Sequence, residues 1–381
     1  MVAQPRMETD RWQIRHAKIL HEKSPQKITF RGRILPCVMG IPTDSKSRLP
    51  KKHRGSRPEG NAHIKLESVL RWHTVRSCKI FSYFNPMLSR LQVASILFMR
   101  LGYNETMMII QNPDFNIQKI AESGQCFRLK PTQNGGFALV AQGRVLRLTD
   151  TPDGVALDCT QAEFNAVWHD YFDLAIDYAA IRARVDSTDA FLLRACDYGA
   201  GIRMLRQDTW EMLVSFIISQ RKNIPAIQYC IEALCSRYGE PIESEGERFY
   251  AFPSAETLAT LDEAHFLACS LGYRAKYVLA AARMVAAGTL NLAAIASCSD
   301  EALFAALLSV PGVGEKVANC VMLFGYHRLA RFPRDVWINR IEAQKYDGAF
   351  PLEQYPDIAG VLQQYIFYYA RSAEYAAKIL P

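Results

Sequence analysis

The segment Leu308-Ser-Val-Pro-Gly-Val-Gly-Glu-Lys-Val-Ala-Asn-Cys320, followed fifteen residues later by Asp335, constrains this chain more than any other. Apolar residues recur at helical spacing on both sides of a short turn that holds Gly312 and Gly314, so the pattern predicts a helix, a turn and a second helix. Glycines can adopt positive φ, and the first N–H groups of a helix have no partner within it. A hairpin of this kind therefore suits a phosphate group.

Two side chains of this region can carry chemistry. Lys316 falls in the first turn of the second helix, where the helix dipole disfavours an ammonium and so favours a nucleophilic amine. Asp335 follows Pro333 and precedes another apolar stretch of helical period, so it fits an N-cap as well as a catalytic carboxylate.

The stretch from Pro311 to Cys320, with Pro333-Arg-Asp-Val-Trp337 downstream, resembles the helix-hairpin-helix DNA glycosylases and specifically their 8-oxoguanine branch. Family members that combine base excision with strand cleavage carry a lysine and an aspartate where Lys316 and Asp335 stand, nineteen residues apart. The resemblance implies that Lys316 forms a Schiff base with the deoxyribose and permits β-elimination, while Asp335 stabilises positive charge on the sugar. Double-stranded DNA containing an oxidised purine is the implied partner.

The same resemblance implies a pocket for the flipped base. Gly124, in Ala121-Glu-Ser-Gly-Gln-Cys-Phe-Arg128, would accept the N7–H that distinguishes 8-oxoguanine from guanine. Gln363 would bind the Watson–Crick edge, and Cys320 and Phe367 would stack on the two faces of the purine. Without the resemblance, Gly124 fits a simple bend and Phe367 fits ordinary aromatic packing.

Further matches concern the DNA around the lesion. In Leu271-Gly-Tyr-Arg-Ala-Lys-Tyr277, the resemblance implies that Tyr273 fills the gap left by the flipped base and that Arg274 faces the orphaned cytosine. Gly312 and Gly314 would meet phosphates. The run Arg221-Lys-Asn223 departs from the family, because Arg221 stands where an asparagine that contacts the cytosine is expected. We predict that Arg221 and Asn223 contact DNA; solvated charge at a helix end is the alternative for Arg221.

Charge is divided unevenly along the chain. Residues 1–106 carry 20 Lys and Arg against 7 Asp and Glu, net +13, whereas residues 107–381 carry 25 against 31, net −6. The predicted catalytic part must therefore meet DNA through a local basic patch rather than through its total charge. The ten cysteines form no Cys-x-x-Cys pair and none follows Asp335, which argues against zinc and an iron–sulfur cluster. We predict no metal and no cofactor.

The fold class predicted is α+β and mostly α. A basic extension (1–106) precedes a small antiparallel β domain (107–188), in which strands alternate between Phe115 and Asp158, and a helical glycosylase domain (189–381). The helices expected there are Asp208–Gln220, Ile224–Tyr238, Ser254–Ser270, Arg274–Ala287, Asp300–Ser309, Glu315–His327, Asp335–Tyr346 and Asp357–Lys378.

The extension allows two interpretations: a basic arm that tethers DNA, or a disordered segment or upstream sequence translated from a misassigned start, with Met107 or Met108 as the true start. It shows no secretory pattern, and its longest apolar run, Leu91–Leu101, is too short to span a bilayer. Scattered thiols suit a reducing compartment. We expect a monomer in the bacterial cytoplasm with no membrane contact.

Three other functions compete with the one implied. An alkylated-base glycosylase would share the fold but act through the aspartate alone, so Lys316 argues against it. A non-catalytic helix-hairpin-helix module would bind DNA but would need neither Asp335, Gly124 nor Gln363. A mismatch adenine glycosylase would require the cluster cysteines that this chain lacks.

Overall fold

The computed structural model describes residues 107–133 and 135–379, so the predictions for residues 1–106 lie outside it. Its main sheet has the strand order β1-β5-β4-β3-β2, and every neighbouring pair is antiparallel. The strands are β1 (Met107–Ile110), β2 (Leu129–Pro131), β3 (Phe137–Ala141), β4 (Arg144–Thr151) and β5 (Gly154–Asp158). Gln142 and Gly143, both at positive φ, connect β3 to β4 in two residues, as the hairpin pattern predicted.

One part of the predicted strand region is helical instead. Helix α3 (Ile117–Glu122) begins at Asn116, whose side chain accepts a hydrogen bond from the backbone of Lys119. Its buried residues Ile117, Ile120 and Ala121 follow the helical period of three and four, which the turn-rich surroundings masked. The expectation of strands from Phe115 onward was therefore wrong for this stretch.

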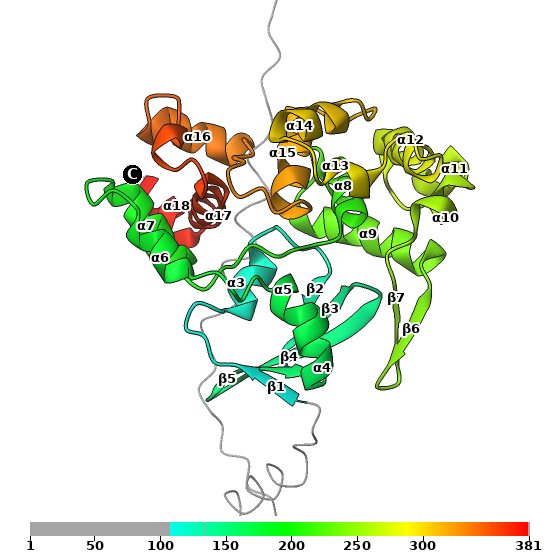
Figure 1. Ribbon diagram of the computed structural model, residues 1–381, viewed down its shortest axis with the longest axis horizontal. Coiled ribbons are helices and arrows are strands. Elements are labelled where there is room, and N and C mark those ends of the chain that lie inside the picture. The colour runs from blue at the N-terminus through cyan, green and yellow to red at the C-terminus, as the bar shows by residue number, and fades with distance from the viewer. Residues whose placement is uncertain (1–106, 134, 380–381) are drawn as a thin grey trace, which may run out of the picture. The chain divides into compact units, whose positions relative to one another are not determined.

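Short helices follow β5. They are α4 (Gln161–Glu163), a π-helix (Phe164–Trp168), α5 (His169–Tyr171) and α6 (Tyr178–Ala183). The first of them cover the sheet, whereas α6 lies beside the helices (Figure 1). Trp168, Tyr171 and Phe172 pack with the apolar face of the sheet and with α3 in one core. These segments lie in the predicted β domain, whose boundary at residue 188 stays a prediction.

The rest of the described chain is mostly helical, in agreement with the predicted fold class. Six of the predicted helices are confirmed: α8 (Thr209–Ser219), α9 (Ile224–Tyr238), α12 (Ala275–Ala286), α14 (Asp300–Leu308), α15 (Glu315–Phe324) and α16 (Val336–Lys345). Helices α7 (Ala190–Gly199) and α13 (Leu292–Ile295), and a hairpin of β6 (Pro241–Ser244) and β7 (Glu247–Tyr250), were not predicted.

Two predicted helices are each divided in two. The stretch Ser254–Ser270 forms α10 (Ala255–Ala259) and α11 (Glu263–Leu267), because the Asp262 side chain accepts hydrogen bonds from two backbone N–H groups and starts a new helix. The last stretch forms α17 (Ala359–Ala370) and α18 (Ala373–Ile379), and Ser372 Oγ accepts from the backbone of Tyr375.

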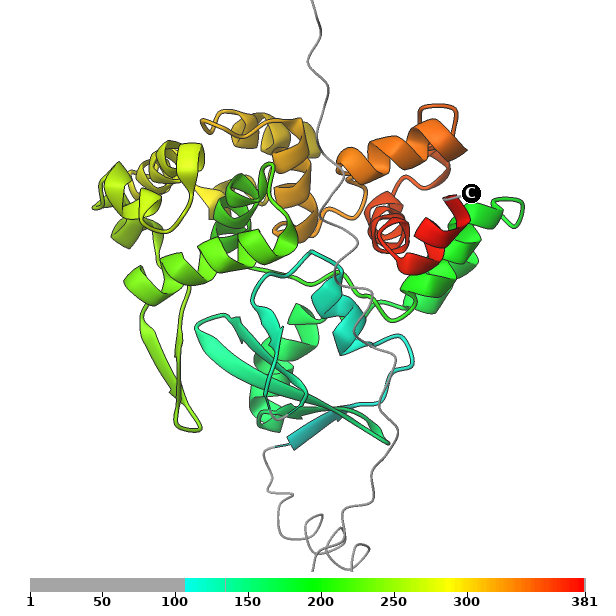
Figure 2. The ribbon, with the colours of Figure 1, turned by 180° about the vertical axis from the view of Figure 1, so that it is seen from behind.

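The helices gather in two groups beside the sheet, as Figures 1 and 2 show. In one, α7 packs against α17, which also packs against α16; in the other, α8 packs against α15 and α12. The extended segment between α7 and α8 passes along the sheet domain, where Gln125 bonds to the backbone of Arg203 and Leu205. The predicted catalytic helix α15 and the predicted base-binding helix α17 therefore belong to different groups.

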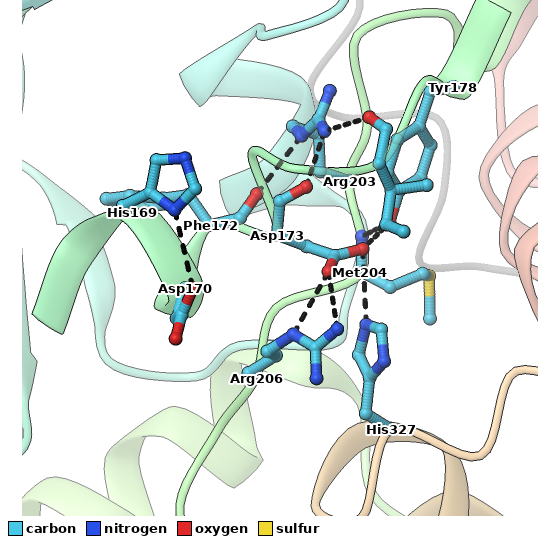
Figure 3. Close-up of polar contacts among 10 residues, drawn as sticks. His169, Asp170, Phe172, Asp173, Tyr178, Arg203, Met204, Arg206 and His327 are labelled. Atoms are coloured by element: carbon cyan, nitrogen blue, oxygen red, sulfur yellow. Dashed lines mark hydrogen bonds and ion pairs between the residues drawn. The ribbon is translucent and has the colours of Figure 1, made fainter. Parts of the chain in front are cut away.

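A buried polar cluster joins the end of α15 to the sheet domain (Figure 3). The Asp173 carboxylate accepts from Tyr178 at 2.9 Å and Arg206 at 3.0 Å and lies 3.2 Å from His327 Nε2, just beyond α15. Burial acts to raise the pKa of Asp173, but these hydrogen bonds and charges outweigh it and hold that pKa below its ordinary value. The cluster thus fixes α15 relative to the sheet with an ionised carboxylate.

A pH-dependent stability is expected from Glu211, in the first turn of α8. Burial raises its pKa to about 7, above the ordinary 4.5, although Arg128 opposes the shift. A raised folded-state pKa contributes stability below pH 4.5 that is lost as pH rises through 7. We therefore expect Glu211→Gln to stabilise the protein by about 1–3 kcal/mol at pH 8 and less at pH 5, measured by urea unfolding. The exposed Glu263→Gln, in the first turn of α11, is the control; equal gains at both pH values would contradict the expectation.

Candidate active site

The predicted hairpin lies between α14 and α15. Gly312 has φ +83°, and a Cβ there would collide with the ring of Tyr277, so the turn requires glycine for both conformation and space. Its carbonyl accepts from Gln220 Nε2 at 3.0 Å. Gly314, in contrast, is the extended N-cap of α15 at φ −102° and has open space around it, so the positive φ that glycine permits is not used there. Gly314 offers no capping side chain, which leaves the first N–H groups of α15 for a ligand.

Helix α15 brings Lys316 and Cys320 together. Lys316 is half-buried, with Nζ 5.3 Å from the ring centroid of Phe216, and Cys320 is 3% exposed. Burial raises the pKa of the Cys320 thiol, the charge of Lys316 and its hydrogen bond to the thiol oppose this rise, and the charge of Asp335 adds to it. The lysine, the thiol and the carboxylate therefore share one electrostatic environment.

Asp335 is the N-cap of α16, as the sequence indicated. Its Oδ1 accepts from the backbone N–H groups of Trp337 and Ile338, both at 2.9 Å. Within the described part of the chain, Oδ2 has no hydrogen-bond partner. One oxygen holds the helix, and the other remains for a charged group.

Gln363, on α17, has an unusual environment. It is 5% exposed, and its Nε2 donates to the carbonyl of Pro333 at 3.1 Å, two residues before Asp335. Its Oε1 is buried and has no hydrogen-bond partner among the described residues. An unpaired buried acceptor costs about 1–3 kcal/mol. The Watson–Crick edge of a guanine base presents N–H donors that would relieve this cost.

Gly124 meets α17 across the domain junction. It has φ +79°, and a Cβ there would lie 3.2 Å from Cε1 of Phe367 and 3.0 Å from Cδ1 of Ile224. The glycine is therefore needed for the bend and for its close approach to Phe367. These contacts do not test whether the Gly124 carbonyl accepts a hydrogen bond from N7–H of the lesion, so that role stays a prediction.

Of the residues predicted to contact DNA, some are exposed and others already form hydrogen bonds within the protein. Tyr273 is 48% exposed, as a wedge requires, and Arg221 is exposed with φ +52°. Asn223 is exposed but caps α9, accepting from the backbone of Ala226 at 3.0 Å. Arg274 is 6% exposed beneath the ring of Tyr273, at 4.3 Å from its centroid, and donates to the carbonyls of Gln220 and Leu271. Contact between Arg274 and a cytosine would require these bonds to rearrange.

Three further contacts of α17 were not predicted from the sequence. Gln364, Tyr368 and Arg371 all donate to the segment Glu122–Ser123, directly before Gly124. Packing was the alternative interpretation of the aromatic stripe that includes Phe367, and it holds for the fully buried Tyr365. The spacing of four and three along one helix face was the available signal.

The remaining features of residues 107–133 and 135–379 concern metal ions, membranes, thiols and one cavity. No group of three His, Cys, Asp or Glu side chains there could hold a metal ion, and none of the described helices has the length and apolar character needed to cross a membrane. All eight cysteines in this range are free thiols. A cavity of about 430 Å³ bordered by Arg128, Trp210 and Phe252 contains none of the predicted site residues.

Comparison with known proteins agrees with this geometry. The sequence matches the 8-oxoguanine DNA glycosylase N-terminal domain over residues 107–213 and the HhH-GPD superfamily of base excision DNA repair proteins over residues 214–348. The structure of MBOgg1 in complex with a low affinity DNA ligand is 40% identical, with 70% of this chain and 96% of that chain covered and a TM-score of 0.67.

Two further relatives extend the comparison. The 8-oxoguanine glycosylase/lyase of Clostridium acetobutylicum, solved with double-stranded DNA containing cytosine opposite 8-oxoguanine, is 35% identical over 69% of this chain and 97% of its own, with a TM-score of 0.64. The N-glycosylase/DNA lyase of Saccharomyces cerevisiae is 38% identical over 160 residues, which is 38% of this chain and 42% of the yeast protein. The chain belongs to the 8-oxoguanine DNA glycosylase family of the HhH-GPD superfamily.

Proposed function

We propose that this protein excises 8-oxoguanine from double-stranded DNA and cleaves the strand at the same site, with Lys316 as nucleophile and Asp335 as the supporting carboxylate. The observation that carries the proposal is that Asp335 caps α16 through one oxygen and leaves the other without a partner in the described part of the chain, while the half-buried Lys316 stands in the first turn of α15. Its relatives, one an N-glycosylase/DNA lyase and one an 8-oxoguanine glycosylase/lyase, support the same activity.

The proposed reaction begins with loss of the base. As the glycosidic bond lengthens, positive charge grows on the deoxyribose, and the free oxygen of Asp335 stabilises it. Lys316 gives up a proton and its nitrogen forms a bond to C1′, while the electrons of the glycosidic bond leave with the base, which takes up that proton. Ring opening then gives a Schiff base between Nζ and C1′.

Strand cleavage follows from the same intermediate. The protonated Schiff base acidifies the C2′ hydrogens, so loss of one of them expels the phosphate from C3′ by β-elimination. Hydrolysis of the remaining imine releases Lys316. One lysine thus serves both the glycosylase and the lyase step.

The base would lie between Cys320 and Phe367 with its Watson–Crick edge at Gln363. The unpaired Oε1 of Gln363 would accept from the base, and the Gly124 carbonyl would accept from N7–H. Guanine carries a lone pair at N7, so it would place two acceptors opposite each other. Selectivity would then come from the Gly124 backbone.

The DNA around the lesion would be held by the hairpin and by the residues that directly precede α9 and α12. Phosphates would meet the free N–H groups near Gly312 and Gly314, and Tyr273 would fill the space of the extruded base. Arg221, Asn223 and Arg274 would contact the opposite strand. We also propose a monomer in the bacterial cytoplasm, consistent with free thiols.

A direct test is incubation with a duplex that contains 8-oxoguanine opposite cytosine. We expect release of the lesion and cleavage of its strand, and no reaction with the matched guanine duplex. On a separate duplex that carries 3-methyladenine, release of that base without strand cleavage, together with no reaction on 8-oxoguanine, would favour an alkylated-base glycosylase instead. Binding of the duplex with no release of any base would indicate a non-catalytic helix-hairpin-helix module.

The N7 contact is tested by a substrate change. Alanine at Gly124 would be strained at φ +79° whatever its role, so the substitution is a poor probe. An 8-oxoguanine analogue with carbon in place of N7 removes the hydrogen-bond donor and leaves the protein intact. We expect single-turnover excision to fall by about 10- to 100-fold, because the Gly124 carbonyl would lose its partner. Unchanged excision would place selectivity elsewhere.

A further inference from the structure

Three residues on one side of α17 hold the segment before Gly124. Gln364 Nε2 donates to the Ser123 carbonyl at 2.6 Å, and Tyr368 Oη donates to the Glu122 carboxylate at 3.0 Å. Arg371 Nη1 donates to the Glu122 carbonyl at 3.3 Å. The proposed N7-reading loop is therefore anchored to the same helix that carries Gln363 and Phe367.

Arg371 differs from the other two anchors, because most of its donors remain free. Its Cζ lies 4.9 Å from the ring centroid of Phe367, and its charge is near enough to interact with Asp335 and Glu122. The residue is exposed, and Nε and Nη2 have no hydrogen-bond partner in the described part of the chain. A cation at the end of a helix often donates hydrogen bonds to the last carbonyls of that helix. Within the described part of the chain, the Arg371 side chain donates to the Glu122 carbonyl and to none of the carbonyls of α17.

The order of side chains along α17 gives Arg371 a place relative to the base. Gln363, Phe367 and Arg371 are four residues apart, so they follow one another along one face of the helix. A purine stacked on Phe367 with its Watson–Crick edge at Gln363 turns its five-membered ring toward Arg371. Atoms N7 and C8 belong to that ring.

The lesion differs from guanine at those two atoms: N7 gains a hydrogen and C8 gains an oxygen. We propose that Arg371 is a specificity-determining residue that donates a hydrogen bond to O8, while the Gly124 carbonyl accepts from N7–H. The Arg371 donor and the Gly124 carbonyl acceptor would together match the C8=O and N7–H groups of the lesion. Guanine has neither the N7–H donor nor the O8 acceptor, and its C8–H would face the guanidinium. This inference rests on the proposed function.

The test compares two substrates in two proteins. An 8-thioguanine lesion keeps N7–H but replaces O8 by sulfur, a weak acceptor. Wild-type protein should excise 8-oxoguanine faster than 8-thioguanine in single-turnover reactions on duplex DNA. In Arg371→Leu the 8-oxoguanine rate should fall by about 10- to 100-fold, and the 8-thioguanine rate should fall only by the smaller factor that follows from losing the bond to the Glu122 carbonyl. The preference between the two substrates should then disappear.

Tyr368→Phe is the matched control. It removes another anchor of Glu122 without altering the guanidinium, so it should lower both rates by a common factor and preserve the ratio. If Arg371→Leu fails to fold, Arg371→Lys serves in its place: one ammonium cannot bond both the Glu122 carbonyl and O8 in the manner of a guanidinium, so the ratio should still fall.

The inference is overturned if Arg371→Leu lowers both rates equally, because the residue then only positions the loop, or if it lowers neither. Failure of the proposed function itself would give a different result. In that case, the wild-type protein would excise neither substrate.

Discussion

Lys316→Gln is expected to abolish strand cleavage and covalent trapping by borohydride, with a loss of about 10³-fold or more in product formation. Borohydride reduces a Schiff base to a stable amine, and glutamine cannot form that bond. Lys316 is half-buried against Phe216, so glutamine fits the space without a cavity. Affinity for lesion duplex should change little, which electrophoretic mobility or fluorescence anisotropy would measure.

Lys276→Gln is the control for this substitution. Lys276 also lies over an aromatic ring, at 5.1 Å from the centroid of Tyr277, whose ring borders Gly312 of the hairpin. It should retain full trapping, because its amine lies over a ring that borders the hairpin but has no part in the proposed reaction. Trapping at the wild-type level in Lys316→Gln would refute the assignment of the nucleophile.

Asp335→Asn is expected to lower excision by about 10²–10³-fold while the melting temperature changes little. Asparagine keeps an oxygen that can accept from the N–H groups of Trp337 and Ile338, so α16 retains its cap. The substitution removes only the negative charge, which the account requires as the sugar becomes positive. Single-turnover excision and thermal unfolding, measured on the same preparation, separate the two effects.

A second N-cap provides the comparison. Asp208 caps α8, accepting from the backbone of Glu211 at 2.8 Å, and Asp208→Asn should leave excision unchanged. Asp335→Ala should lose the cap as well as the charge, at a further cost of about 1 kcal/mol in stability. If Asp335→Asn reduced stability and excision in parallel, the residue would be a structural cap and nothing more.

Local sequence patterns predicted most of the parts that position the site. The apolar period of α15, the turn at Gly312 and the N-cap at Asp335 are all determined by residues within a few positions of one another. The hairpins of the sheet followed from Gln142-Gly143 and the alternation around it. Such features depend on short-range physics, which a single sequence displays directly.

The errors have short-range causes too. Glycine permits positive φ, and the sequence left the backbone of Gly314 open, whereas the structure places it at an N-cap with extended backbone. Asp262 divides a predicted helix because its side chain bonds to the backbone that follows it, a signal present in the sequence and overlooked. The hairpin of β6 and β7 turns at Glu245 and Gly246, both at positive φ, within a polar stretch that we did not read as strands.

The contacts of α17 could not have been found in this way. Arg371 and Tyr368 meet Glu122 across nearly the whole described chain, and Gln363 owes its unpaired oxygen to the position of Pro333. The burial of Arg274 beneath Tyr273 likewise depends on Gln220, which belongs to a different helix region. Only the folded chain brings these groups together.

The central claim is that the Nζ of Lys316 forms the covalent bond to DNA. It is tested most directly by mass spectrometry of the trypsin-digested, borohydride-trapped complex. Modification of Lys316 blocks cleavage after it, so the adduct should appear on a single peptide of residues 284–328, with fragment ions that place the mass of the sugar on Lys316. An adduct on any other lysine, or on the N-terminal amine, would contradict the account.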